Sequence, residues 1–100
     1  MRAAAQRGTR AKMIFKLMDG AKEDIAYWKK KDRATLEKIR KLTLNIGQTP
    51  FTGLEKPEPL RHELAGWWSR RISGEHRLVY RIIGHRGDEL CQIAQARGHY

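Results

Sequence analysis

The chain has 100 residues, enough for one domain that buries roughly two-thirds of its unfolded surface and too few for a second core. Hydrophobic residues make up 40% and charged residues 32%, which excludes a disordered chain, and no apolar stretch approaches the roughly 20 residues that span a bilayer. A net charge of +10 favours nucleic acid as the leading partner class; a solvated basic surface and a docking site for an acidic protein are the alternatives.

The first segment, MRAAAQRGTRAK, is basic and contains no acid. We expect residues 1–12 to be an N-terminal extension, an appendage to a single domain over residues 13–100. That domain begins with MIFKLM, a short apolar run from Met13 whose near-alternation predicts a strand.

Two helices are predicted next. Asp19 can cap the first, which ends in the lysine run of residues 29–31. Asp32 can cap the second, and Gly47 is suited to end it. Stripes at helical spacing comprise Ala21, Ile25 and Trp28 in the first helix, and Leu36, Ile39, Thr43 and Ile46 in the second. The basic residues Lys38, Arg40 and Lys41 lie off this stripe and are most simply a solvated face.

The rest of the chain predicts a loop followed by a sheet. Residues 48–59 lose the helical period and contain three prolines and a glycine. Four short segments follow, separated by the turn signals AG, SGE and GHRGD: LRHEL, WWSRRI, HRLVYRII and ELCQIAQA. We therefore predict an α+β fold, in which an antiparallel sheet of the first strand and three to four C-terminal strands packs against the two N-terminal helices.

The single cysteine, Cys91, lies in the last apolar segment and is predicted to be a small buried thiol. It cannot form an internal disulfide, which favours a reducing compartment. Because no signal-peptide core is visible either, we expect a soluble, cytoplasmic protein with no membrane partner.

Two arginines are candidates to hold an anion. If SGE forms a three-residue loop, Ile72 pairs with His76, and Arg71 then lies opposite Arg77 on the next strand. Like charges that face each other across a sheet are unfavourable unless an anion such as phosphate lies between them. The alternative is a two-residue turn, which slips the register and separates the arginines.

Glu58 stands between Pro57 and Pro59, whose fixed φ angles make this a stiff place for a carboxylate. Stiffness suits a general base; the alternative is a polar loop that enters a strand. The four histidines have no zinc-motif spacing, so no metal is expected, and His85 is expected to be exposed in a turn.

A carboxylate, imidazoles and facing arginines are groups that can cut RNA without a metal. A base removes the proton of the 2′-OH, an acid protonates the departing 5′-oxygen, and cations stabilise the charge that develops at phosphorus. Composition alone does not say whether these groups converge.

One long string carries a resemblance: TPFTGLEKPEPLRHELAGWWSRRISGEHRLVY. With KPEPL, WSRRI, EHRLVY and a terminal His-Tyr in this order, the chain from Met13 to Tyr100 resembles the YoeB-type toxins of the RelE superfamily, which are messenger-RNA interferases. The resemblance implies that residues 13–100 form a single toxin domain with a microbial-ribonuclease-like fold, a sheet of antiparallel strands with two helices on one side.

The resemblance also implies an activity. The expected protein is a ribosome-dependent endoribonuclease toxin of a type II toxin–antitoxin system, which inhibits translation. It would cleave mRNA in the A site of the small ribosomal subunit without a metal or cofactor, and leave a 2′,3′-cyclic phosphate and a 5′-OH. The implied partners are mRNA on the ribosome and a cognate acidic antitoxin, and a homodimer is compatible with the resemblance. The alternative is a non-catalytic basic module that binds RNA or the ribosome.

Residue roles follow from the resemblance by position. It implies that Glu58 is the general base, His99 the general acid, and Arg77 a catalytic residue at the scissile phosphate. Substrate or phosphate binding is assigned to Arg71, Arg61, Tyr100 and Lys56. Supporting roles are assigned to His62 and Glu75. Arg61 stands where the family usually has a lysine, which keeps the charge and changes the geometry.

Three features depart from the family pattern. They are the extension at residues 1–12, a slightly longer last hairpin, GHRGDE, and Gly98 in place of a bulkier residue. Gly98 is expected to loosen His99, so that the site is completed when RNA or the ribosome arrives.

Overall fold

The computed structural model describes residues 13–85 and 87–98. The expected extension at residues 1–12 and the terminal pair His99 and Tyr100 therefore lie outside the described residues. The elements in chain order are β1 (Met13–Leu17), α2 (Asp19–Lys31), α3 (Arg33–Gln48), β2 (Glu58–Pro59), a 3-10 helix η1 (His62–Leu64), β3 (Trp68–Ser73), β4 (His76–His85) and β5 (Asp88–Gln95).

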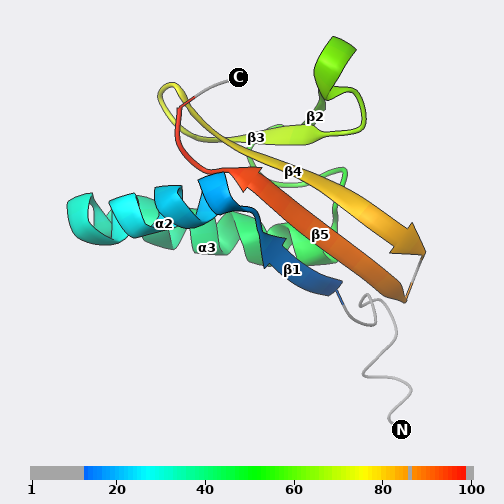
Figure 1. Ribbon diagram of the computed structural model, residues 1–100, viewed down its shortest axis with the longest axis horizontal. Coiled ribbons are helices and arrows are strands. Elements are labelled where there is room, and N and C mark those ends of the chain that lie inside the picture. The colour runs from blue at the N-terminus through cyan, green and yellow to red at the C-terminus, as the bar shows by residue number, and fades with distance from the viewer. Residues whose placement is uncertain (1–12, 86, 99–100) are drawn as a thin grey trace, which may run out of the picture.

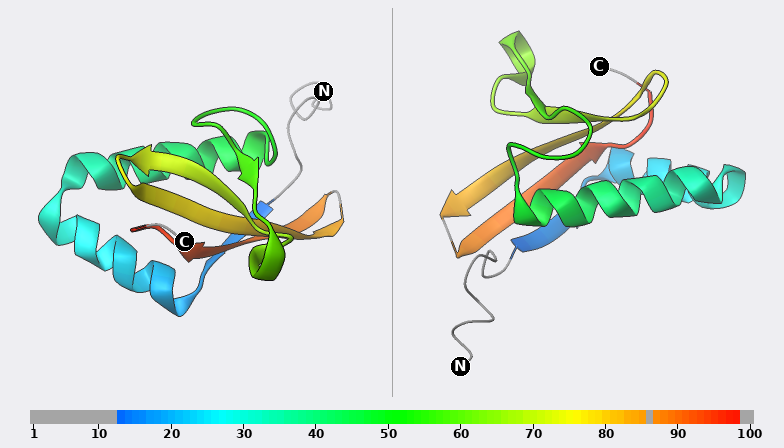
Figure 2. Two further views of the ribbon diagram at one scale, coloured as in Figure 1. Left: turned by 90° about the horizontal axis from the view of Figure 1, so that it is seen from above. Right: turned by 180° about the vertical axis from the view of Figure 1, so that it is seen from behind.

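The described strands form one sheet in the order β1-β5-β4-β3-β2. Both helices lie on the same side of this sheet (Figure 1), and seen from above they form a hairpin whose arms diverge (Figure 2). The predicted α+β class, with two N-terminal helices packed against a sheet, is confirmed.

The sheet differs from the prediction at its two edges. β1 runs parallel to β5, with Met13 beside Glu89, whereas the other neighbouring strands are antiparallel. A parallel pair needs a long connection, which the helices and the intervening strands provide. At the other edge LRHEL forms η1 rather than a strand, because the chain turns at His62, which has a φ of 57°. The fourth antiparallel strand is instead Glu58–Pro59, inside the predicted loop, and Pro59 suits this edge because it has no N–H to donate.

One of the two predicted helix caps is confirmed. The Asp32 carboxylate accepts hydrogen bonds from the backbone N–H groups of Ala34 (3.0 Å) and Thr35 (3.4 Å) and from the Thr35 hydroxyl (2.8 Å). The Thr35 hydroxyl is the largest cause of a lowered pKa for Asp32, because these donors favour its ionised form. Asp19, by contrast, is the first residue of α2 and not its cap; its negative charge instead lies in the first turn.

Helix α3 continues beyond the predicted stop at Gly47. It ends at Gln48, where the Thr49 N–H donates to the Asn45 carbonyl at 2.8 Å. Gly47 lies against the aromatic ring of Phe15, which a Cβ at this position would meet at 3.4 Å. This glycine therefore makes room for packing against β1 and does not end the helix.

The core lies between the helices and the sheet. Its buried members are Ala21, Trp28, Ile39, Leu42 and Ile46 from the helices, and Ile72, Leu78, Tyr80, Cys91, Ile93 and Ala96 from β3, β4, β5 and the residue after β5. Four of the seven residues in the two predicted helical stripes are thus buried, while Ile25, Leu36 and Thr43 are only half-buried. No helix within the described ranges is long and apolar enough to cross a membrane.

The Cys91 thiol is fully buried, as predicted, and burial raises its pKa from 9.0 to about 12. Because the folded pKa is the higher one, the thiol stabilises the fold below pH 9, and this contribution is lost as the pH rises towards 12. We expect iodoacetamide at pH 8.5 to alkylate Cys91 about a thousandfold more slowly in the native protein than in guanidinium chloride, since only the thiolate reacts. Mass spectrometry of timed samples measures both rates, and equal rates would contradict the buried position.

Candidate active site

A buried arginine holds the loop that leads to Glu58. Arg70 is 0% exposed, and its side chain lies on the helix-facing side of β3 beneath residues 49–54. Its guanidinium donates hydrogen bonds to the carbonyl oxygens of Thr49 (2.6 Å), Thr52 (2.8 Å) and Leu54 (3.2 Å), to Asn45 Oδ1 (2.6 Å) and to the Tyr80 hydroxyl (3.1 Å). These bonds replace the water that the buried charge has lost, and they fix the loop on the sheet.

The chain after this loop adopts an unusual backbone conformation. Glu55 and Lys56 have φ angles of 59° and 51°, a left-handed conformation that costs non-glycine residues roughly 1–2 kcal/mol each. The Glu55 carbonyl accepts from the Arg71 N–H at 3.1 Å, and the Glu55 carboxylate pairs with Lys38 Nζ at 3.1 Å. Such strain is often found at functional sites, and here it directs the chain into β2.

Lys38 corrects the prediction of a wholly solvated basic face on the second helix. It is half-buried, and in addition to its ion pair its ammonium donates to the Ile72 carbonyl at 3.0 Å. Arg40 and Lys41 are exposed, as predicted.

The pocket on the sheet face that is turned away from the helices is small and polar. It has a volume of about 180 Å³ and is lined by Lys56, Glu58, Ser69, Arg71 and Arg77. Glu58 pairs with Ser69 between β2 and β3, and Arg71 pairs with Arg77 between β3 and β4. The pairing therefore brings one carboxylate and two guanidinium groups to a single hollow, an arrangement suited to an anion beside a base.

The register that places the arginines opposite each other was predicted for the wrong reason. His76 pairs with Ser73 and not with Ile72, so the turn contains two residues rather than three. An irregularity between Arg71 and Ser73 then restores the pairing of Arg71 with Arg77. Both arginines thus face each other although the turn is the shorter one, because an extra residue in β3 compensates for it.

Two buried nitrogens near this face have no hydrogen-bond partner in the described part of the chain. They are Arg77 Nη1 and Gln95 Nε2. Gln95 pairs with Val79, which pairs with Ser69 of the pocket, so Gln95 lies in the same cross-strand row as Glu58. Donors buried without an acceptor are costly, and a ligand with acceptor oxygens would satisfy them. Little in the sequence indicated Gln95. Alternation along β5 could have placed it on this face of the sheet, but the pairing of β5 with β4 is irregular near residue 94 and breaks that alternation.

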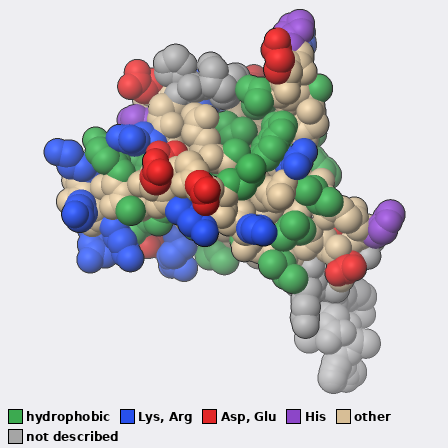
Figure 3. Space-filling model, in the orientation of Figure 1, with side chains coloured by type: hydrophobic (Ala, Val, Ile, Leu, Met, Phe, Trp, Pro, Cys, Tyr) green, Lys and Arg blue, Asp and Glu red, His purple; other side chains and the backbone are tan. Residues whose placement is uncertain are grey.

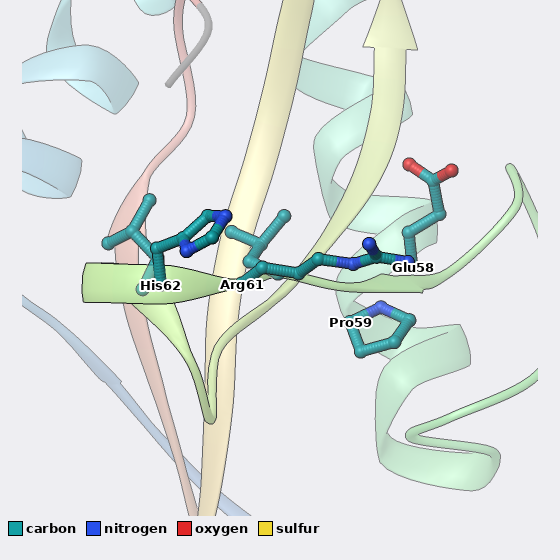
Figure 4. A pocket seen from close by; sticks show the side chains of 6 residues that line it. Glu58, Pro59, Arg61 and His62 are labelled. Carbon is teal, nitrogen blue, oxygen red and sulfur yellow. The ribbon is translucent and has the colours of Figure 1, made fainter.

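Glu58 also borders a second, larger pocket. This pocket has a volume of about 440 Å³, and its lining includes Glu58, Arg61 and His62. In Figure 4 the Glu58 carboxylate and the Pro59 ring point to opposite sides of the strand, with Arg61 and His62 farther along the same segment. The carboxylate therefore stands at the border between the small polar pocket and the wider one.

The remaining predicted residues lie elsewhere. Glu75 is exposed in the turn between β3 and β4 and lines neither of these two pockets. His85 ends β4 and is exposed, as predicted. His99 and Tyr100 lie outside the described residues. Within residues 13–85 and 87–98, His, Cys, Asp and Glu side chains form no group of three or more that could hold a metal ion.

Basic side chains also gather far from the pockets. The lysine run at residues 29–31 is exposed in the last turn of α2, where positive charge is favourable for the helix dipole. Figure 3 shows Lys and Arg side chains concentrated over this end of the molecule. The protein thus has a second basic surface that is separate from the polar pocket.

Comparisons with known proteins agree with one another. A family model described as a YoeB-like toxin of bacterial type II toxin–antitoxin system matches residues 17–100. Toxin YoeB of Mycobacterium bovis is 49% identical over 78 residues, which are 78% of this chain and 87% of that protein. The structure of the YoeB/ParE toxin from Agrobacterium tumefaciens is similar, with a TM-score of 0.86 and 42% identity over 88% of this chain and all of that chain (100%).

Two structures of YoeB from Staphylococcus aureus are also similar to this chain. One is a YoeB dimer, with a TM-score of 0.78, and the other a heterotetrameric YoeB-YefM toxin–antitoxin complex, with a TM-score of 0.77. Each is 34% identical to this chain and covers 90% of it and 100% of the solved chain.

Proposed function

Because the chain belongs to the YoeB-like toxins of bacterial type II toxin–antitoxin systems, we propose that it is an endoribonuclease that cleaves mRNA in the A site of the ribosome. The observation that carries the proposal is the polar pocket, in which the Glu58 carboxylate stands beside Arg71 and Arg77. A phosphodiester fits such a pocket, because two guanidinium groups can bind its oxygens while the carboxylate faces a neighbouring hydroxyl.

The proposed reaction needs no group from outside the protein and the RNA. The Glu58 carboxylate takes the proton of the ribose 2′-OH, and the 2′-oxygen forms a bond to the adjacent phosphorus. The bond from phosphorus to the 5′-oxygen breaks, and a general acid gives that oxygen a proton. The products are a 2′,3′-cyclic phosphate and a 5′-OH. Arg71 and Arg77 stabilise the additional negative charge in the transition state.

Other residues receive roles that stay predictions. His99 would be the general acid and Tyr100 would position the RNA. Lys56, in the polar pocket, and Arg61, in the larger one, would bind phosphates on either side of the cleaved bond, with His62 in support. Glu75 lines neither pocket, so we propose no contact between it and the substrate.

Replacement of Glu58 tests the reaction. We expect Glu58→Gln to lower the rate of mRNA cleavage by about 100-fold or more, because the amide cannot accept the proton, while RNA and ribosome binding persist. The measurement maps new 5′ ends on a translated message, with and without ribosomes and purified protein. Glu63→Gln is the matched control, since Glu63 is exposed on η1 next to the larger pocket and lines neither pocket.

The alternative function is a non-catalytic module that binds RNA or the ribosome, and the exposed lysine run favours it. That module would bind with a strong salt dependence and would yield no new 5′ ends with the wild-type protein. Equal cleavage by the wild type and by Glu58→Gln would instead reject the assignment of the base.

We also propose a protein partner and a location. An acidic antitoxin would neutralise the basic surface and suppress the activity; the support for a protein partner is that a similar toxin forms a YoeB-YefM toxin–antitoxin complex. We also propose a homodimer, because the similar YoeB from Staphylococcus aureus forms a dimer. Action on translated mRNA would place the protein in the cytoplasm.

A further inference from the structure

The chain beyond β5 is held by side chains of other elements. Strand β5 ends at Gln95, and the residues that follow are the C-terminal anchor, residues 96–98. The Ala96 N–H donates to Asp24 Oδ2 at 2.9 Å, and the Ala96 carbonyl accepts from Trp28 Nε1 at 2.8 Å. Side chains of α2 thus satisfy both backbone groups of Ala96, which is 0% exposed.

The next residue of the C-terminal anchor is also fixed by α2. The Arg97 guanidinium pairs with Asp24 Oδ1 at 3.4 Å and lies 4.0 Å from the centre of the Tyr27 ring. An ion pair and a cation–π contact together restrict a long side chain that would otherwise be free in solvent.

The last described residue is held by β4. The Gly98 N–H donates to His76 Nδ1 at 2.9 Å, and the Gly98 carbonyl accepts from the Arg77 N–H at 2.8 Å. The His76 ring stands edge-on to Trp28, with ring centres 4.9 Å apart, so its direction is set by packing. Gly98 has a φ of 77°, which glycine adopts without strain.

This geometry shows how Gly98 itself is held. The glycine was expected to loosen the chain before His99, which lies outside the described residues. Gly98 itself has both backbone polar groups bonded, and its left-handed φ is the conformation that lets it reach His76 and Arg77 together. The glycine therefore fits the C-terminal anchor better than a larger residue would.

We propose that His76 is a positioning residue for RNA cleavage, which it assists through Gly98. The inference rests on the proposed endoribonuclease function. His76 accepts a hydrogen bond from the Gly98 N–H. It thereby holds Gly98 in the position at which the Gly98 carbonyl accepts a hydrogen bond from the Arg77 N–H, and the Arg77 side chain lines the polar pocket. It also fixes the point from which the chain continues, one peptide bond later, to His99. Loss of this acceptor frees a glycine, the most flexible residue, directly before the proposed general acid.

Two substitutions of His76 separate its hydrogen bond from its packing. His76→Phe keeps a ring against Trp28 and removes the acceptor. His76→Asn removes the ring and keeps an oxygen near the place of Nδ1. We expect His76→Phe to lower kcat by about 10- to 100-fold with little change in KM or in the melting temperature, and His76→Asn to recover most of the rate.

The experiment uses the full chain with translating ribosomes. Cleavage of mRNA by the wild type is measured first. In parallel, NMR follows hydrogen exchange of the Gly98 and Arg77 amides in the free protein. Faster exchange in His76→Phe than in the wild type and His76→Asn, together with the loss in kcat, supports the proposal. The proposal is overturned if the wild type cleaves mRNA and His76→Phe cleaves it at the same rate. It is also overturned if His76→Phe and His76→Asn lose kcat to the same extent.

Failure of the proposed function has a different signature. If the wild type yields no new 5′ ends, the endoribonuclease assignment fails and His76 loses its role in cleavage with it. The exchange of the Gly98 amide then still decides whether His76 holds the C-terminal anchor in place. Unchanged exchange in His76→Phe would show that it does not.

Discussion

Replacement of Arg77 by methionine should leave the protein at least as stable as the wild type and should reduce mRNA cleavage by roughly 100- to 1000-fold. One guanidinium nitrogen of Arg77 is buried and has no hydrogen-bond partner within the described residues, and Arg71 lies opposite with the same charge. Removal of this charge relieves both the repulsion between the two arginines and the cost of the buried nitrogen without a partner in the free protein. The same removal takes away a donor that would bind the phosphate as charge develops on it.

Two measurements together check this prediction: the melting temperature of the free protein and the single-turnover rate of cleavage. Arg81→Met is the matched control, because Arg81 lies on the same strand but contacts Gln92 and the Trp67 ring instead of the pocket. We expect the control to cleave at nearly the wild-type rate. A destabilised Arg77→Met would mean that the arginine pair is structural, and full activity would remove Arg77 from the site.

Replacement of Arg70, the residue before Arg71 on β3, by methionine should instead cause a large loss of stability. The change leaves the carbonyl oxygens of the loop at residues 49–54 and the Tyr80 hydroxyl without their donor. We expect the free energy of unfolding to fall by roughly 3–5 kcal/mol, a large part of the stability of a domain of this size. At about 4–8 °C per kcal/mol, the melting temperature falls by roughly 12–40 °C.

Arg71→Met is the matched control for stability, since it removes the same charge from the adjacent position, which is exposed and lies on the opposite face of β3. Its melting temperature should stay within a few degrees of the wild type. Thermal unfolding followed by circular dichroism compares the two variants. If Arg70→Met unfolds at the same temperature as Arg71→Met, the hydrogen bonds of Arg70 do not hold the loop.

These adjacent arginines show what the sequence could predict about the site. Alternation along β3 puts their side chains on opposite faces of the strand, and the resemblance to known toxins singles out Arg71. Nothing in the local sequence says that Arg70 is the buried one, because three of its five acceptors are backbone carbonyls of a loop that lies 16 to 21 residues away. A buried charge that is bonded to main-chain oxygens leaves no pattern of side chains to recognise.

The fold was predictable where local signals decide it. The two helices follow from their apolar stripes and from the Asp32 cap, and most of the C-terminal strands follow from alternation. The edges of the sheet were not predictable in this way. The parallel pairing of β1 and the short strand at Glu58 depend on which distant segments meet, and the irregularity beside Ile72 depends on the pairing itself.

The parallel pair at the edge of the sheet also affects the order in which the protein can fold. Met13 lies beside Glu89, so the first described strand pairs with the last one, and a ribosome makes β1 well before it makes β5. Contacts between such distant segments are slow to form, because a long loop must close before they gain any stability. The anchor that bonds Gly98 to Arg77 belongs to the same late region. The nascent chain therefore completes the described sheet only after β5 has been made, although the residues that line the polar pocket, all between Lys56 and Arg77, are made earlier.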